Sequence, residues 1–294
     1  MKLTVEELKN KRVGVVFSSG FFGFFAHAGC LKALEELGIK PAGYAGTSSG
    51  AIAAAFAAAG LSAEQIRAIL FNLRKQDFWD PEPWYKTVAS ALRLFKGSLG
   101  YLEGERFRQL LERNLPVQQF QELKTPCVIV GANITKKKRE VFSSGSICDA
   151  VQASGTIPWT FKMKRIGENY FLDGGLIDKA PLEALRTHVP VDAIIVHYIA
   201  SQELTENGNS FLLKRFSPQR AYGLSISIAR HEHYLAQKKL AEQQGVMVIE
   251  LKPKLPFVTP DHLDRGREAF ETAYGYAIKE LRSWGVEELQ QWLR

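Results

Sequence analysis

The chain has 294 residues, 46% hydrophobic and 23% charged, which is typical of a globular protein with a full core and excludes a disordered or fibrous one. Its formal net charge of +7 is spread along the sequence without a nucleic-acid-binding motif, so we expect no nucleic-acid partner. The three cysteines, Cys30, Cys127 and Cys148, lack metal-ligand spacing, which predicts reduced thiols and no metal site.

The N-terminal residues 1–8 are acidic and polar, unlike a secretion signal. No stretch approaches the about 20 apolar residues that a membrane span requires. We therefore expect a cytoplasmic protein that contacts membranes, if at all, from the periphery.

The first predicted element is a buried parallel strand at 13–17, which is apolar throughout. It ends at the small-residue loop 18–23, and a helix is expected over 25–37, with Gly38 as its stop. The spacing Ser18-x-Gly20-x-x-Gly23 also resembles a dinucleotide fingerprint. It lacks the first glycine, and no acid ends the second strand, so we expect no nucleotide cofactor.

The second strand-to-helix turn carries the motif G-x-S-x-G at 46–50. Glycines on both sides of Ser48 allow a tight turn that exposes the hydroxyl, and the following helix N-terminus favours developing negative charge. The pentapeptide alone fits an ordinary turn equally well. If the first two strands are parallel neighbours, the loop 18–23 and Ser48 share one sheet edge, which is the geometry that acyl transfer requires.

An irregular aromatic segment at 77–101 lies between predicted helices at 63–75 and 103–114. It either packs over the core or forms a lid that dips into lipid, because Trp and Tyr suit the membrane interface. The basic cluster 136–139 either forms a solvated turn between two strands or is weakly attracted to an anionic membrane surface.

The remaining elements alternate between strands and helices, which predicts an α/β fold. The later strands are expected at 126–134, 140–142, 162–166, 169–172, 193–198 and 247–251, and the later helices at 147–154, 217–244 and 261–284. Residues 203–210 are expected to form a polar loop. No repeat or linker interrupts the chain, so we predict a single domain over 1–294 with a helical C-terminal portion at 201–294.

A serine needs a neighbour that accepts its proton. None of the six histidines lies in a pattern that declares a Ser-His-Asp triad, and His27 fits a packing role near the glycine loop. The alternative base is Asp173, which follows a strand and precedes two glycines, although an ordinary Asp-Gly turn has the same pattern. As a base, Asp173 would need burial to raise its pKa above the usual value of about 3.9.

Several ordered motifs together resemble the bacterial patatin-like phospholipases. The matching segments are 18–20 with 26–36, then 46–50, 150–158 and 170–182, within a motif-bearing region of about 12–200. The resemblance implies a three-layer α/β/α fold with a mainly parallel sheet. It also implies a serine acyl hydrolase that cleaves fatty acyl esters of lipids or phospholipids.

The same resemblance implies a role for each matching residue. Ser48 would be the nucleophile, Asp173 the base, and the backbone N–H groups of Gly20 and Phe21 the oxyanion hole. No metal or organic cofactor is implied. Peripheral membrane contact is expected through the aromatic segment 77–101.

The glycine loop departs from the family pattern, which is G-G-G-x-(Arg/Lys)-G. Without a gap, Phe21 replaces the third glycine, Gly23 the basic residue and Phe24 the last glycine. A phenylalanine does not readily adopt a positive φ. Four phenylalanines near the nucleophile favour acyl chains over charged headgroups. Two rival hypotheses follow: a catalytically weak relative that binds lipid or a protein partner, and a Ser-His-Asp esterase.

Overall fold

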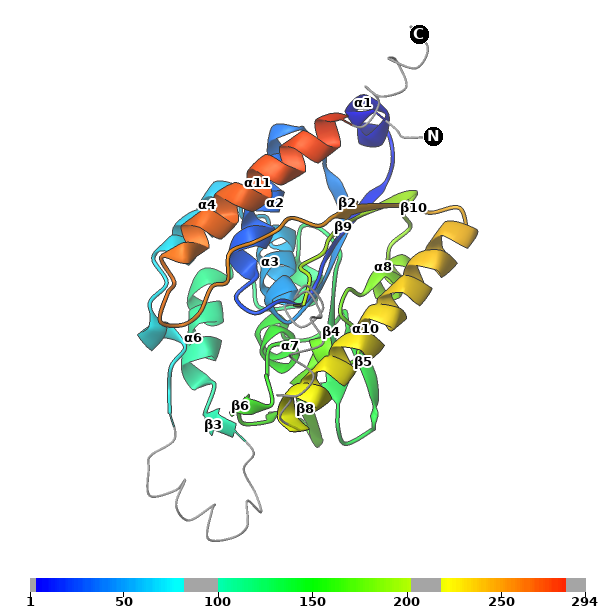
Figure 1. Cartoon of the computed structure of the whole chain (residues 1–294). Helices are drawn as coiled ribbons and strands as arrows, with labels where there is room; N and C mark the ends of the chain where they lie inside the picture. The colour runs from blue at the N-terminus through cyan, green and yellow to red at the C-terminus, as the bar shows by residue number, and fades with distance from the viewer. Residues whose placement is uncertain (1–3, 82–99, 202–217, 284–294) are drawn as a thin grey trace, which may run out of the picture.

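The computed structural model describes residues 4–81, 100–201 and 218–283 (Figure 1). Its centre is an eight-stranded sheet with the order β10-β9-β1-β2-β4-β8-β7, and β5 pairs with β4 beside this path. The strands are β1 Val13–Phe17, β2 Pro41–Thr47, β4 Cys127–Asn133, β5 Lys138–Phe142, β7 Lys164–Ile166, β8 Asn169–Asp173, β9 Ala193–His197 and β10 Met247–Leu251. Strands β10, β9, β1, β2 and β4 are parallel, whereas β5 and β8 run antiparallel to β4 and β7 runs antiparallel to β8.

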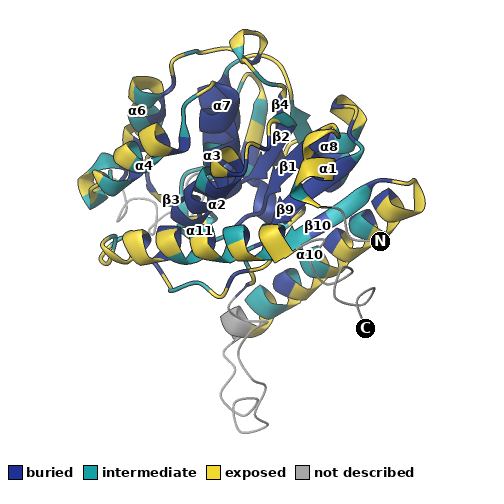
Figure 2. Cartoon of the chain, turned by 90° about the horizontal axis from the view of Figure 1, so that it is seen from above, coloured by how far each residue is buried: buried dark blue, intermediate teal, exposed yellow. Residues whose placement is uncertain are grey.

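Helices cover both faces of the sheet. They are α1 Val5–Lys9, α2 Phe24–Glu36, α3 Ser49–Ala58, α4 Ala63–Phe71, α6 Glu105–Asn114, α7 Ile147–Ser154, α8 Leu182–His188, α10 Pro218–Gln243 and α11 Arg265–Ser283. Val15 packs into a core with α2, α3 and α11, whereas the next residue, Val16, packs into a second core with α8 and α10. Because adjacent residues of β1 pack into cores on opposite faces, the sheet is buried on both sides (Figure 2). The predicted three-layer α/β/α architecture with a mainly parallel sheet is confirmed.

Many local elements follow the sequence pattern, but some differ from it. Helix α4 ends at Phe71 and not at 75, and helices α1 and α8 were not predicted. Strand β1 and helix α7 have their predicted bounds. The basic cluster was predicted as a turn over 136–139, but β5 already begins at Lys138. Arg139 of this cluster forms an ion pair of 2.9 Å with the buried Asp178. Its charge is therefore paired within the protein and not with a membrane surface.

A small second sheet was not predicted. Strands β3 (Gly100–Leu102) and β6 (Trp159–Phe161) pair in parallel. Most of the predicted aromatic segment 77–101, namely residues 82–99, lies outside the described residues, as does the predicted polar loop 203–210.

The C-terminal elements belong to the same sheet and core as the motif-bearing region. Strand β10 extends the sheet beside β9, and α11 crosses α2 (Figure 1). The crossing is close because Gly29 lacks a side chain: a Cβ there would lie 2.1 Å from the Phe270 carbonyl oxygen. None of the described helices combines the length and the apolar character needed to cross a bilayer.

Candidate active site

Ser48 lies in the sharp turn between β2 and α3, with a φ of 56° that non-glycine residues rarely adopt. The flanking glycines make this turn sterically feasible. A Cβ on Gly46 would lie 2.2 Å from the Gly50 carbonyl oxygen, and one on Gly50 would lie 2.2 Å from the Phe17 carbonyl oxygen. The motif therefore forms a strained strand-to-helix turn of the kind that presents a nucleophile.

The Ser48 hydroxyl donates a hydrogen bond of 2.6 Å to Asp173 Oδ2. Asp173 ends β8, which pairs with β4, and β4 in turn pairs with β2, so two neighbouring contacts in the sheet bring the residues together. The second carboxylate oxygen, Oδ1, accepts the Gly175 N–H at 2.6 Å. The Gly175 N–H can reach this oxygen because the D-G-G turn folds back onto the Asp173 side chain.

The Asp173 carboxyl group is buried, and burial raises its pKa to about 6. The hydrogen bonds from Ser48 and Gly175 and the charges of Arg230 and Lys179 act in the opposite direction, because they favour the ionised carboxylate. The balance is a carboxylate that is ionised near neutral pH and more basic than an exposed aspartate.

Ser154 supports the strained turn and was not predicted to do so. Its Oγ accepts the Ser48 N–H at 2.8 Å and donates to the Val130 carbonyl oxygen at 2.6 Å. Ser154 is fully buried at the end of α7, so this hydroxyl ties the turn to the centre of β4. The only sequence signal was its position in segment 150–158.

The glycine loop lies beside the turn, as the parallel pairing of β1 with β2 requires. Gly20 and Phe21 line the same cavity as Ser48, and neither backbone N–H donates to any described residue. The loop closes through the Gly23 N–H, which donates to the Gly20 carbonyl oxygen at 3.0 Å. The residue with positive φ is Phe22, at 50°, so the loop does place a phenylalanine in a conformation that the sequence argues against.

A cavity of about 400 Å³ opens above Ser48 and Asp173. Most of its lining is aromatic or aliphatic, including Phe21, Phe22, Phe24, Ile52, Phe56, Leu70, Phe78, Trp79, Phe107, Leu111, Ile157 and Phe161. Three of the four loop phenylalanines take part. The fourth, Phe25, is buried elsewhere and packs against Gly266 of α11. Among the described residues, Asp173 and Arg230 are the charged side chains of the lining.

All six histidines lie in the described residues, and none lines this cavity or bonds to Ser48. His27 and His197 are fully buried and bond to each other through their Nδ1 atoms at 2.7 Å, while His27 Nε2 donates to the Ser18 carbonyl oxygen. Burial lowers the pKa of both, that of His197 to about 3, so the pair is neutral. The geometry gives a Ser-His-Asp triad no support.

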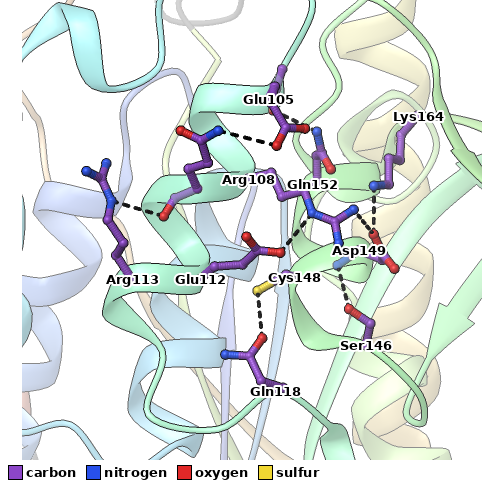
Figure 3. Close-up of polar contacts among 12 residues, drawn as sticks. Glu105, Arg108, Glu112, Arg113, Gln118, Ser146, Cys148, Asp149, Gln152 and Lys164 are labelled. Atoms are coloured by element: carbon purple, nitrogen blue, oxygen red, sulfur yellow. Dashed lines mark hydrogen bonds and ion pairs between the residues drawn. The ribbon is translucent and has the colours of Figure 1, made fainter.

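A polar cluster joins α6 to α7 and β7 (Figure 3). Asp149 of α7 binds Arg108 of α6 at 3.2 Å and Lys164 of β7 at 2.6 Å. Gln152 of α7 also donates to the Gly104 carbonyl oxygen, just before α6 begins. These contacts hold α6, which carries part of the apolar lining, against the helix that supports Ser48.

Arg230 of α10 is the second residue that sequence reasoning missed. It reaches the site from the C-terminal portion, where no motif was recognised, and its guanidinium donates to the Gly175 carbonyl oxygen at 3.0 Å. No signal in the sequence distinguishes it from the other basic residues of the same helix. Within the described ranges, His, Cys, Asp and Glu side chains form no group of three that could hold a metal ion.

The strained serine turn, the buried carboxylate and the apolar cavity place the chain in the class of α/β proteins that present a serine above a parallel sheet. Residues 15–186, more than half of the chain, match the model of the patatin-like phospholipase family. The chain belongs to this family, as its motifs indicated.

Curated relatives are similar over part of their length. An uncharacterised NTE family protein of Mycobacterium bovis is 25% identical over 61% of this chain and 47% of its own length. The lysophospholipase NTE1 of Cryptococcus neoformans is 25% identical over 64% of this chain and 11% of its own length. The chain therefore spans less than half the length of these relatives. Among solved structures, VipD from Legionella pneumophila aligns with a TM-score of 0.49 and 18% identity, over 93% of this chain and 67% of that one.

Proposed function

We propose that the protein is a serine acyl hydrolase that cleaves fatty acyl esters of lipids through a Ser48–Asp173 dyad. The observation that carries the proposal is the 2.6 Å hydrogen bond from the Ser48 hydroxyl to a buried carboxylate at the floor of an apolar cavity. The neutral, mutually bonded His27 and His197 leave Asp173 as the base within reach of Ser48.

In the first half-reaction Ser48 Oγ attacks the ester carbonyl while its proton passes to Asp173 Oδ2. The raised pKa of about 6 makes this transfer easier than it would be for an exposed aspartate. The unpaired N–H groups of Gly20 and Phe21 are the proposed donors to the oxyanion. The tetrahedral intermediate collapses, the proton moves from Asp173 to the leaving alkoxide, and the alcohol departs from an acyl-enzyme.

In the second half-reaction water attacks the acyl-enzyme. Asp173 accepts a proton from the water, the same donors hold the second oxyanion, and the proton returns to Ser48 Oγ as the fatty acid leaves. The reaction needs no cofactor and consumes one ester and one water. The apolar lining supports a long acyl chain as the acyl group, because burying such a chain is favourable.

The name of the fungal relative, a lysophospholipase, makes lysophospholipids the first substrates to test. Access to such lipids fits a cytoplasmic protein that contacts membranes peripherally. Exposed aromatic residues support that contact: Trp159 is 76% exposed beside the cavity residues Pro158 and Thr160, and Phe21 is 47% exposed. We also propose that residues 1–294 form one domain, since β10 and α11 complete the same sheet and core.

A fluorophosphonate probe tests the dyad, because it labels only an activated serine. We expect wild type to be labelled and to hydrolyse lysophospholipid, and Ser48→Ala and Asp173→Asn to lose both activities while remaining folded. Ser49→Ala is the matched control: its hydroxyl is buried without a hydrogen-bond partner, so removing it costs no bond. Full labelling of Asp173→Asn would show that another group is the base.

The alternative, a catalytically weak lipid- or partner-binding protein, is favoured by one observation, the unusual backbone of Phe22 in the glycine loop. It predicts no labelling of wild type at any pH. The Ser-His-Asp alternative predicts that a histidine-to-alanine substitution abolishes labelling.

A further inference from the structure

Arg230 is held rigidly at the wall of the cavity that contains Ser48. Its Nη1 donates to the Gly175 carbonyl oxygen at 3.0 Å, and its Nη2 donates to Ser201 Oγ at 2.9 Å and Ser227 Oγ at 3.2 Å. These three acceptors are neutral and come from three separate segments of the chain. The guanidinium is therefore fixed in place without a carboxylate partner.

The charge of Arg230 is not neutralised by any described carboxylate. Its Nε–H is buried and donates to no described residue, and the ion pairs among the described residues do not include this side chain. Asp173 is the one acid among the described residues of the lining, and its two oxygens accept hydrogen bonds from Ser48 and Gly175. Because the described partners of this cation are neutral and its side chain lines the cavity, the site favours an anionic ligand.

The chemistry of the ligand follows from the cation. A fixed guanidinium in the wall of the cavity binds a phosphate well, because phosphate oxygens match its charge and planar geometry. Gly175 contacts Arg230 through its carbonyl oxygen and Asp173 through its N–H, so one residue separates the cation from the dyad. A phosphate at Arg230 would lie close to an ester at Ser48, with the acyl chain in the apolar part of the cavity.

We propose that Arg230 is a specificity-determining residue that selects acyl esters carrying a phosphate near the scissile ester, as in a lysophospholipid. This inference rests on the proposed hydrolase function and names the group that the substrate must carry. A positioning role is the competing explanation, because Arg230 also braces Gly175. The two explanations differ in one respect: bracing affects every substrate, whereas selection affects only those with a phosphate.

Binding of ether lipids separates selection from bracing without any hydrolysis. The probes are 1-O-dodecylglycerol 3-phosphate and 1-O-dodecylglycerol, titrated below their micellar concentrations into the full chain by calorimetry. We expect wild type to prefer the phosphate-bearing lipid. Arg230→Gln should weaken the binding of that lipid by about 10- to 100-fold, which is the contribution of one hydrogen bond to a charged group. It should leave the affinity for the neutral lipid unchanged. The affinity of Arg230→Lys for the phosphate-bearing lipid should lie between those of wild type and Arg230→Gln, since lysine keeps the charge and loses the planar guanidinium.

Lys239→Gln is the matched control, because it removes one exposed positive charge from the same helix away from the cavity. It should bind both lipids as wild type does. If Arg230→Gln weakened the binding of both lipids equally, with an unchanged melting temperature, the result would overturn the proposal in favour of bracing. Displacement of the lipid by an equal concentration of inorganic phosphate would assign the site to free phosphate and would also overturn it.

The same titration keeps the two proposals distinct. Ether lipids contain no ester, so their binding is measurable even if Ser48 proves unreactive toward the fluorophosphonate probe. In that case the hydrolase function fails while a phosphate preference that depends on Arg230 stands. Hydrolysis of phosphorylated and neutral esters at equal rates, unchanged in Arg230→Gln, would reject the selection and leave the dyad intact.

Discussion

Replacing Ser154 with alanine tests whether one buried hydroxyl holds the nucleophile in its strained conformation. Ser154 Oγ accepts the Ser48 N–H and donates to the Val130 carbonyl oxygen, at 2.8 and 2.6 Å. Ser154→Ala leaves two buried backbone groups unpaired, each at a cost of about 1–3 kcal/mol. We expect the free energy of unfolding, measured with urea, to fall by about 2–4 kcal/mol.

The same substitution should slow the reaction of Ser48. A non-glycine residue held in a sparsely populated φ/ψ region stores about 1–3 kcal/mol, and without the Ser154 bond the turn can relax toward an unreactive geometry. Relaxation of that size corresponds to fluorophosphonate labelling that is slower by about 5- to 150-fold. Labelling is followed over time under conditions where the variant is fully folded.

Ser146→Ala is the control for this experiment, since it removes a serine from the other end of the same helix. Ser146 caps α7 by accepting the Asp149 N–H, and it makes no contact with Ser48. The loss of a cap costs about 1 kcal/mol, so this variant should be destabilised and still labelled at the wild-type rate. Labelling of Ser154→Ala at the wild-type rate would refute the argument that this hydroxyl maintains the turn.

Three further predictions concern the dyad, its turn and helix α10. Asp173→Asn should be more stable than wild type at pH 8 by about 3 kcal/mol, because the carboxyl pKa rises from 3.8 to about 6 on folding, and this difference should vanish near pH 3. The unfolded chain releases that proton first, so wild-type stability falls as pH rises from 4 to 6, whereas labelling rises with ionisation of the base. A pH series of urea midpoints measures the difference, and its absence would contradict the burial argument. Gly46→Ala should unfold or severely destabilise the protein, because its Cβ would lie 2.2 Å from the Gly50 carbonyl oxygen. Gly223→Ala, whose Cβ would meet nothing within 4 Å in α10, should instead gain about 0.5–1 kcal/mol in thermal unfolding.

The sequence predicted those features that depend on a local pattern. Strand β1 is apolar at every position because both faces of the sheet are covered, and this pattern gave its bounds. Helix α7 was predicted over its observed range, between Ser146, which caps it, and Gly155, which ends it. The local pattern left Asp173 open between a base and an ordinary Asp-Gly turn. The family resemblance paired it with Ser48, and the two side chains are hydrogen-bonded.

Features that depend on distant packing could not be predicted. Strands β3 and β6 have three residues each, and their pairing joins segments more than 50 residues apart. Arg230 reaches the D-G-G turn only because α10 packs beside it, and neither segment carries a pattern for the other. His27 was expected to pack near the glycine loop, but its partner, His197, became visible only when β9 was placed beside β1.

Features that would be unfavourable elsewhere gather around this cavity. Ser48 has a strained backbone, Asp173 is a buried carboxylate with a raised pKa, and Arg230 has a buried N–H without a partner among the described residues. Each one costs stability. Under the proposed function, the strained serine and the basic carboxylate act on the ester, and the Arg230 cation faces the anionic neighbour of that ester. Because their supports come from β4, β8, α7 and α10, the surrounding core holds all three in position. These destabilising groups therefore mark the place of the proposed chemistry. Substitutions at these positions that raise the stability of the protein should lower its activity.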